Sequence, residues 1–251
     1  MKFRLQAFGL HVFASMCLFL LSLGILYFGW YQWPGWYLTG SLTVVSMMAG
    51  IDVVLGPLLT FTIANPKKPR RELARDIAII ATVQLVALGY GITTLWQGRP
   101  LYYTFSTRFL EMVQATDLSP EQIALGRQLN PDFAPHWYSR PRWVYAPMPK
   151  DDKVVQQIVM SSIEGGDDVI QMPRYFRPWE EGVAQLRKEL RPVAKMTELG
   201  VHDKEVAGQR MREFGVTVDQ PVSLPMMGRG KPLVGVVDPA TGKIRAILRV
   251  D

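Results

Sequence analysis

Charge is nearly absent from the first quarter of the chain. Between Arg4 and Lys67 lie 62 residues whose only formal charge is Asp52. A helix that crosses a membrane needs about 20 consecutive apolar residues, so this stretch has room for two spans and a tight turn. No soluble domain hides so much uncharged chain beside a run of basic residues. The lack of charge therefore excludes a purely soluble protein.

Cysteine is also scarce. Cys17 is the sole cysteine, and it lies inside the first apolar stretch. Residues 98–251 therefore cannot contain a disulfide bond, and packing alone must stabilise them even in an oxidising compartment. They are numerous enough to form one domain with a core of its own.

Motifs of catalysis and of metal or nucleotide binding are missing as well. His11, His136 and His202 lack the spacing of zinc ligands, and one histidine in an apolar stretch cannot supply two facing haem ligands. The Gly-Arg-Gly sequence at 228–230 is too short for a phosphate loop and is typical of a turn. We therefore expect no enzymatic activity, no catalytic residue, no metal and no cofactor.

Three apolar segments predict membrane helices. The first covers residues 10–31 and ends at a turn rich in Trp and Tyr, whose rings favour the headgroup layer. Its apolar run is too long for a cleaved signal peptide, so we interpret it as an uncleaved anchor. The second covers residues 38–64, and the third covers residues 77–96 without a formal charge. Residues 1–97 are therefore predicted to form a three-helix transmembrane domain.

The distribution of basic residues predicts the orientation of these spans. Lys2 and Arg4 flank the first span, and the loop 65–76 is basic, whereas the turn between the first two spans carries no charge. By the positive-inside rule, the N-terminus and this loop are cytoplasmic and residues 98–251 lie outside. Topology accounts for the basic loop, so we expect no nucleic-acid partner. Its topology-determining residues are Lys67, Lys68, Arg70, Arg71 and Arg75.

Asp52 is the one acidic group expected inside the bilayer. A carboxylate there costs at least ~2.5 kcal/mol, so it should be buried against a partner. At ~1.5 Å per residue, Asp52 lies level with Tyr90 of the third span, and Gln84 lies roughly level with Thr60. Pro57 should kink the second span and free a backbone carbonyl close by. These polar groups are the candidate intramembrane contact.

Two interpretations of Asp52 stay open. It is either a functional group, in a proton or ion relay or in a contact with another protein's helix, or a lock that hydrogen-bonds to Tyr90 or Ser22. A transporter normally needs more spans and more than one buried ionisable group, so we favour the lock or the partner contact. Small residues would let the helices approach closely around Asp52. They are Gly50, Gly56, Gly89 and Gly91.

Residues 98–251 predict a mixed α and β domain. Ser119 and Pro120 have the residue types of a helix N-cap and first position. The segment 130–149 contains five prolines and is predicted to be irregular. Predicted strands cover 101–105, 109–113, 233–237 and 243–250, the last two joined as a hairpin, and predicted helices begin at Ser119 and cover 151–164, 179–190 and 203–214.

Several motifs, in order along the chain, resemble a known family. Together with the predicted topology they resemble the TfpX/TfpZ family of type IV pilin accessory proteins over the whole chain. The motifs are MKFRLQAFGLH at the start, GIDVVLGPLLT at 50–60, NPKKPRREL at 65–73, QLVALGYG at 84–91, QGRP at 97–100, LPMMGRG at 224–230 and VDPATG at 237–242.

The resemblance implies a non-enzymatic, chaperone-like factor in a bacterial inner membrane with a periplasmic domain. Such a factor binds a particular type IV major pilin and promotes its stability or its assembly into pili. Expected partners are that pilin, the lipid bilayer and other pilus assembly proteins. The competing hypothesis is a membrane-anchored protein that senses a ligand in the periplasm. It would need a cytoplasmic output module, for which the short predicted cytoplasmic parts leave little chain.

Overall fold

The computed structural model describes residues 1–195, 204–217 and 219–249, and the chain divides into two compact units. The first, the helical unit, comprises residues 1–32 and 41–98, and the second, the sheet unit, comprises residues 33–40 and 99–251. The predicted division after residue 97 is thus wrong for residues 33–40. This short segment joins two apolar helices, yet its side chains pack into the sheet unit.

The helical unit contains three helices that are long and apolar enough to cross a membrane. They cover Lys2–Tyr31, Leu42–Ile63 and Arg70–Gln97. Most of their side chains are exposed, as expected of helices that face lipid. The first consists of α1 (Lys2–Leu26) and the π-helix η1 (Tyr27–Tyr31), the second of α3 (Leu42–Ala49), the π-helix η2 (Gly50–Leu55) and α4 (Gly56–Ile63), and the third is α5 (Arg70–Gln97).

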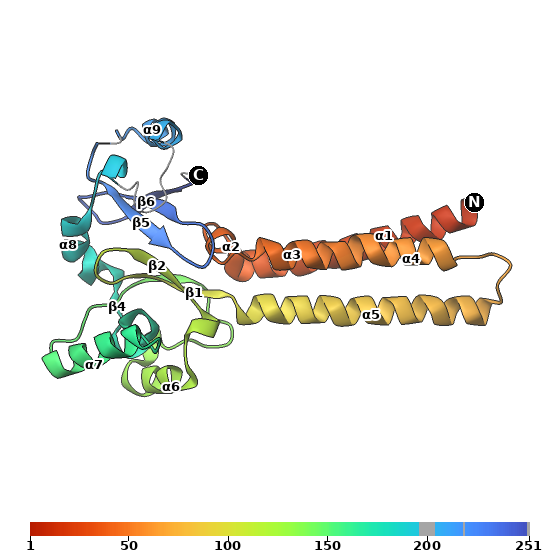
Figure 1. Ribbon diagram of the computed structural model, residues 1–251, viewed down its shortest axis with the longest axis horizontal. Helices are drawn as coiled ribbons and strands as arrows, with labels where there is room; N and C mark the ends of the chain where they lie inside the picture. Colours follow the sequence, from red (N-terminus) through yellow and green to blue (C-terminus); the bar gives the residue numbers. More distant parts are fainter. Residues whose placement is uncertain (196–203, 218, 250–251) are drawn as a thin grey trace. The chain divides into compact units, whose positions relative to one another are not determined.

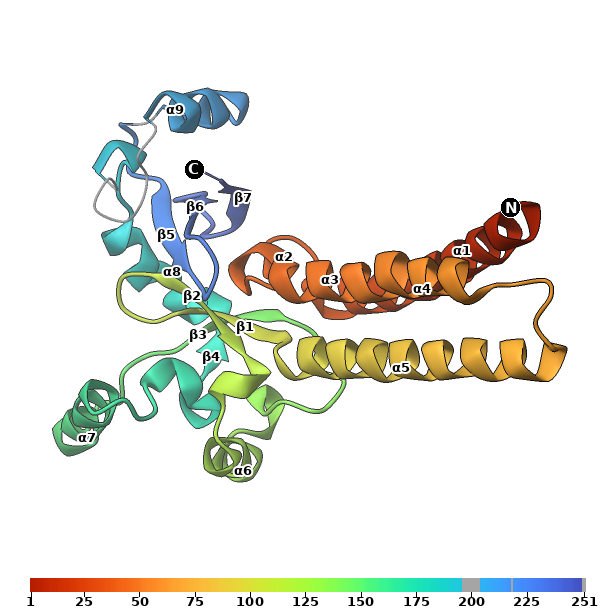
Figure 2. The same cartoon turned by 45° about the vertical axis from the view of Figure 1, so that its right-hand side comes forward.

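Within this unit, α3 and α4 run beside α1, and α5 runs alongside them in the opposite direction to α4 (Figures 1 and 2). Ala64 ends α4 in an extended conformation, and its carbonyl accepts a hydrogen bond from Arg4 Nε at 2.8 Å. In the basic loop, Lys68 forms an ion pair with Asp76. One basic side chain of the loop is therefore neutralised within the chain.

The sheet unit is built on a seven-stranded mixed sheet with the order β4-β3-β1-β2-β5-β6-β7. The β1–β3 and β2–β5 pairs are parallel, and the other pairs are antiparallel. The strands are β1 (Pro100–Phe105), β2 (Leu110–Gln114), β3 (Arg142–Tyr145), β4 (Arg177–Pro178), β5 (Ser223–Met227), β6 (Leu233–Val237) and β7 (Ile244–Leu248).

The structure confirms four predicted strands and corrects one predicted irregular segment. β1, β2, β6 and β7 lie at the predicted positions to within a residue or two at each end, although Val250 lies outside the described residues. The segment 130–149 is not irregular throughout, because β3 lies in it and pairs with β1. β5 was not predicted, and Pro225 within it argues against a strand from sequence alone.

Four longer helices accompany this sheet. Ser119 caps α6 as predicted, since its hydroxyl accepts a hydrogen bond from the Gln122 backbone N–H at 3.2 Å. In Figures 1 and 2, α6 and α7 lie toward the β4 end of the sheet unit and α9 toward its β7 end. The predicted start of the last helix, Asp203, lies outside the described residues. The helices are α6 (Pro120–Leu129), α7 (Asp152–Ile163), α8 (Trp179–Glu189) and α9 (Lys204–Glu213).

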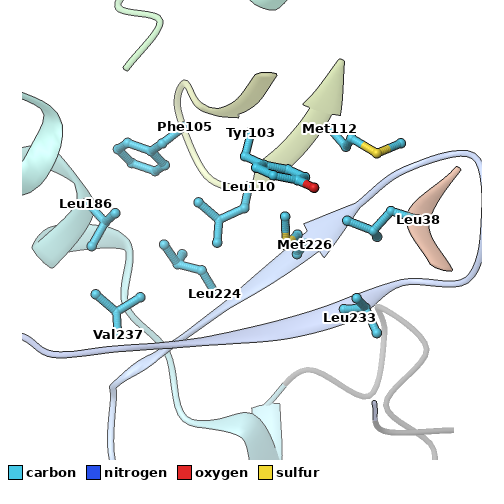
Figure 3. Packing of buried hydrophobic residues seen from close by; sticks show 10 residues of the cluster. All are labelled: Leu38, Tyr103, Phe105, Leu110, Met112, Leu186, Leu224, Met226, Leu233 and Val237. Atoms are coloured by element: carbon cyan, nitrogen blue, oxygen red, sulfur yellow. The ribbon is translucent and has the colours of Figure 1, made fainter. Parts of the chain in front are cut away.

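The connecting segment 33–40 contributes the short helix α2 (Gly35–Leu38) to the core of the sheet unit. Leu38 is 0% exposed and belongs to the same buried cluster as Met226 and Leu233 (Figure 3). The turn 228–230 closes over α2, because the Gly230 N–H donates a hydrogen bond to the Leu38 carbonyl at 2.6 Å. Packing of α2 is therefore part of the fold of this unit.

The close approach of α2 explains both glycines of this Gly-Arg-Gly turn. A Cβ atom at Gly230 would lie 2.1 Å from the Tyr37 carbonyl oxygen, and one at Gly228 would lie 2.6 Å from the Leu38 carbonyl oxygen. Both contacts are to backbone atoms, which cannot move aside as a side chain does. The sequence correctly predicts a turn here, but only the structure shows that the turn packs against the backbone of α2.

Candidate functional site

A cluster of polar side chains joins the three apolar helices of the helical unit. His11 Nδ1 lies 2.6 Å from Thr60 Oγ1, and His11 Nε2 lies 2.7 Å from Gln84 Oε1. Because an amide oxygen can only accept, Nε2 of His11 donates to Gln84, and in a neutral imidazole Nδ1 accepts from the Thr60 hydroxyl. We call these three residues and Asp52 the polar cluster. His11 is the member that sequence reasoning missed.

Pro57 explains why Gln84 reaches the backbone of Asp52. In η2 the hydrogen bonds run from residue i+5 to residue i, as the bond from the Gly56 N–H to the Ile51 carbonyl shows. The next such bond would come from residue 57, which is proline and has no N–H. The Asp52 carbonyl is thereby freed, and Gln84 Nε2 donates to it at 2.9 Å. A freed carbonyl near Pro57 was predicted, and it has its partner on α5.

The side chain of Asp52 does not form the predicted lock. Asp52 is 4% exposed, and neither of its carboxylate oxygens has a hydrogen-bond partner among the described residues. Tyr90 is 77% exposed, so it points away from the other helices, and the Ser22 hydroxyl donates to the Leu18 carbonyl of its own helix. The expected hydrogen bond from Asp52 to Tyr90 or Ser22 is therefore wrong.

Two of the four glycines expected to allow close helix approach do so. A Cβ atom at Gly56 would lie 2.0 Å from Gln84 Nε2, and one at Gly91 would lie 2.5 Å from Met48 Sδ. A Cβ atom at Gly50 or Gly89 would meet nothing within 4 Å. Of these four glycines, Gly56 and Gly91 are therefore the ones that leave room for a side chain of a neighbouring helix.

A groove opens beside the polar cluster. It is a cavity of about 380 Å³, lined by α1, α5 and the segment η2–α4 between them. His11, Asp52, Thr60 and Gln84 all line it, so the cluster and Ser15 form the polar part of a largely apolar surface. The remaining lining residues are Ala7, Leu10, Ala14, Ser15, Leu18, Ile77, Ala81, Leu85 and Leu88.

The sheet unit presents exposed aromatic side chains in the proline-rich segment. Trp137 is 70% exposed and Tyr138 is 58% exposed. The Tyr138 ring stacks on His136 with ring centroids 5.4 Å apart and contacts the Trp137 ring edge-on, also at 5.4 Å. We call residues 136–138 the aromatic patch. Its rings hold one another in place while exposing apolar surface.

Glu111 lies on β2, in the middle of the sheet, and its carboxyl group has a raised pKa. Burial, reinforced by the negative charge of Asp168, raises the pKa of Glu111 to about 7. It is partly buried on β2, where its backbone carbonyl accepts a hydrogen bond from the Thr104 hydroxyl. Among the described residues, no three His, Cys, Asp or Glu side chains gather as metal ligands, and His202 lies outside them.

The chain has helices that fit a membrane protein, and they are followed by a unit built on a mixed sheet. These two features define its general class. No family model and no solved structure matches it. It is 25% identical over 232 residues to a fimbrial assembly protein of serogroup E1 from Dichelobacter nodosus, covering 90% of this chain and 86% of the relative. The values for the serogroup I protein of the same organism are the same.

A third relative has higher identity over a shorter region. The fimbrial assembly protein of serogroups C1 and C2 from Dichelobacter nodosus is 30% identical over 121 residues, which are 48% of this chain and 92% of the relative. The chain therefore belongs to the family of fimbrial assembly proteins. Its role lies in the assembly of pili.

Proposed function

We propose that this chain is a non-enzymatic accessory factor of the TfpX/TfpZ type, which binds a type IV major pilin and promotes its stability or assembly. It lies in the bacterial inner membrane, with three spans, a cytoplasmic N-terminus and a periplasmic sheet unit. The pilin and the lipid bilayer are its partners, and contacts with other assembly proteins follow from the same role. Membership in the fimbrial assembly family and the apolar helices support this proposal.

The observation that best supports pilin binding is the aromatic patch. Exposed Trp and Tyr side chains are enriched where proteins bind proteins, because they bury much apolar surface while losing little conformational entropy. The Trp137 ring contacts the Tyr138 ring, but most of its apolar surface stays exposed. We infer that the patch contacts the globular head of the pilin.

A photo-crosslinking amino acid at position 137 tests this contact in living cells. It should form an adduct with the pilin, whereas the same probe at Phe214, another exposed aromatic residue, should not. Trp137→Ala should reduce pilin capture without lowering the thermal stability of the chain, because the side chain is largely exposed. Equal pilin adducts at both positions, or none at position 137, would contradict a contact through the patch.

Deletion of the chain separates the assembly role from the sensing alternative. A selective fall in pilin abundance and in pili is expected, since an anchored pilin without its factor is exposed to proteolysis. Unchanged pilin and pili after deletion would instead favour a ligand sensor.

Reporter fusions test the proposed topology. A periplasm-specific reporter fused after residue 251 should be active, and one inserted into the basic loop 65–76 should be inactive. The opposite pattern would place the sheet unit in the cytoplasm and exclude contact with a periplasmic pilin head.

A further inference from the structure

The groove of the helical unit extends along α5 for about three helical turns. Its lining on α5 runs from Ile77 to Leu88, which is roughly 16 Å of helix or three turns. Ala7, Ala14 and Ala81 are among its lining residues, and small side chains let a second backbone approach closely. In a bilayer this surface faces the hydrocarbon region, where either a lipid chain or a protein helix must fill it.

The Asp52 carboxylate distinguishes these two occupants. It lines the groove, it is 4% exposed, and both of its oxygens are without a partner in the helical unit, which is described throughout. An unpaired carboxylate within a membrane is costly, and such groups are found paired or at functional sites. A lipid acyl chain has no donor and cannot satisfy Asp52, whereas a helix with a polar side chain or a terminal ammonium group can.

The polar side chains of the cluster form their hydrogen bonds with other groups. One N–H of the Gln84 amide donates to the Asp52 backbone carbonyl, and the amide oxygen accepts a hydrogen bond from His11. The other ring nitrogen of His11 is engaged with Thr60. Each side chain of the polar cluster therefore has a hydrogen-bond partner except the Asp52 carboxylate.

We propose that this groove binds the apolar anchoring helix of the pilin, and that Asp52 accepts a hydrogen bond from a donor on that helix. An ammonium or guanidinium group forms the strongest contact, because a charge-assisted hydrogen bond is about twice as strong as a neutral one. This inference rests on the proposed function, since it takes the pilin as the occupant. It adds the site and the chemistry of recognition within the membrane.

Two neighbouring positions on α5 provide a matched test. Leu85 lines the groove and Val86 does not, although both side chains are more than half exposed at nearly the same depth. In the full-length chain, expressed in cells that make the pilin, a photo-crosslinker at 85 should give an adduct that mass spectrometry maps to the pilin's apolar helix. The same probe at 86 should give mainly lipid adducts.

Substitution of Asp52 then tests whether its carboxylate accepts a hydrogen bond from the pilin helix. Asp52→Leu in the position-85 probe protein should lower the pilin adduct at least about tenfold, which corresponds to the loss of a hydrogen bond to a charged group. Asp52→Asn keeps an acceptor and should retain part of the adduct. Because the carboxylate has no partner in the free protein, Asp52→Leu should raise the unfolding temperature of the purified chain by several degrees. This gain separates loss of binding from loss of folding.

The outcomes are distinguishable. Only lipid adducts at 85, equal pilin adducts at 85 and 86, or an Asp52→Leu protein that captures pilin normally would overturn the groove proposal. If pilin still crosslinks at position 137 in that case, the proposed function stands and only the groove inference fails. If neither position captures pilin, both fail together.

Discussion

Leu38→Ala should destabilise the sheet unit, although Leu38 lies in the connection between two apolar helices. The side chain is 0% exposed and packs in a cluster with Met226 and Leu233 of the β5–β6 hairpin (Figure 3). Truncation of a buried leucine to alanine costs about 2–5 kcal/mol, because apolar contacts are lost and a cavity is left. An effect of this size is a large fraction of the stability of an ordinary domain.

Hydrogen exchange measured by mass spectrometry locates this loss. In the full-length chain in detergent, the peptides that cover β5 and β6 should exchange roughly 30-fold faster or more in Leu38→Ala than in the original protein, whereas peptides of α5 should be unchanged. The matched control is Leu129→Ala, since Leu129 is 62% exposed at the end of α6 and its truncation should change exchange little.

Two results would refute this reasoning. One is unchanged protection of β5 and β6 in Leu38→Ala. The other is a fragment of residues 99–251 that unfolds at the same denaturant concentration as the sheet unit of the full chain. Either result would mean that α2 packs on the sheet without contributing to its stability.

Two further predictions concern the polar cluster and the sheet. Gly56→Ala should lower the stability of the helical unit by about 1–3 kcal/mol in thermal unfolding, because the new methyl group must displace the Gln84 amide and break its hydrogen bonds. The matched control is Gly50→Ala, whose methyl group meets no atom and whose effect should be neutral or slightly stabilising. Because the pKa of Glu111 is raised in the folded state, the protonated form favours folding, so stability should fall by up to about 3 kcal/mol between pH 4.5 and pH 7. Glu111→Gln should remove this slope in unfolding titrations, and a slope that persists in the variant would assign it to other groups.

The sequence predicted the elements that are stabilised by residues close to them in the chain. The Ser119 cap, the helix that becomes α7 and the hairpin β6–β7 were each marked by residues within a few positions of the element. β5 was missed because Pro225 argues against a strand, although β5 pairs with the neighbouring β6. β3 was missed because it is a short strand in a proline-rich segment, and it pairs in parallel with β1, which lies far away in sequence.

The site was only partly predictable, because a count of residues gives depth in the membrane but not direction around a helix. Asp52 and Tyr90 were expected at one level, and Gln84 was expected near Thr60. Gln84 and Tyr90 are six residues apart, which is about 240° around an α-helix, so they face different directions. Gln84 faces the cluster and Tyr90 faces outward. Sequence identified Asp52 as unusual, but only the structure shows that its carboxylate is unpaired.

The chain passes between the two units after Gln32, after Gly40 and after Gly98, rather than once. If the groove holds the pilin helix and the aromatic patch holds the pilin head, the first contact raises the effective concentration of the second. That gain is largest when the connections between the two binding surfaces are short. α2 packs in the core of the sheet unit, so the crossings after Gln32 and after Gly40 lead directly into that core and out of it.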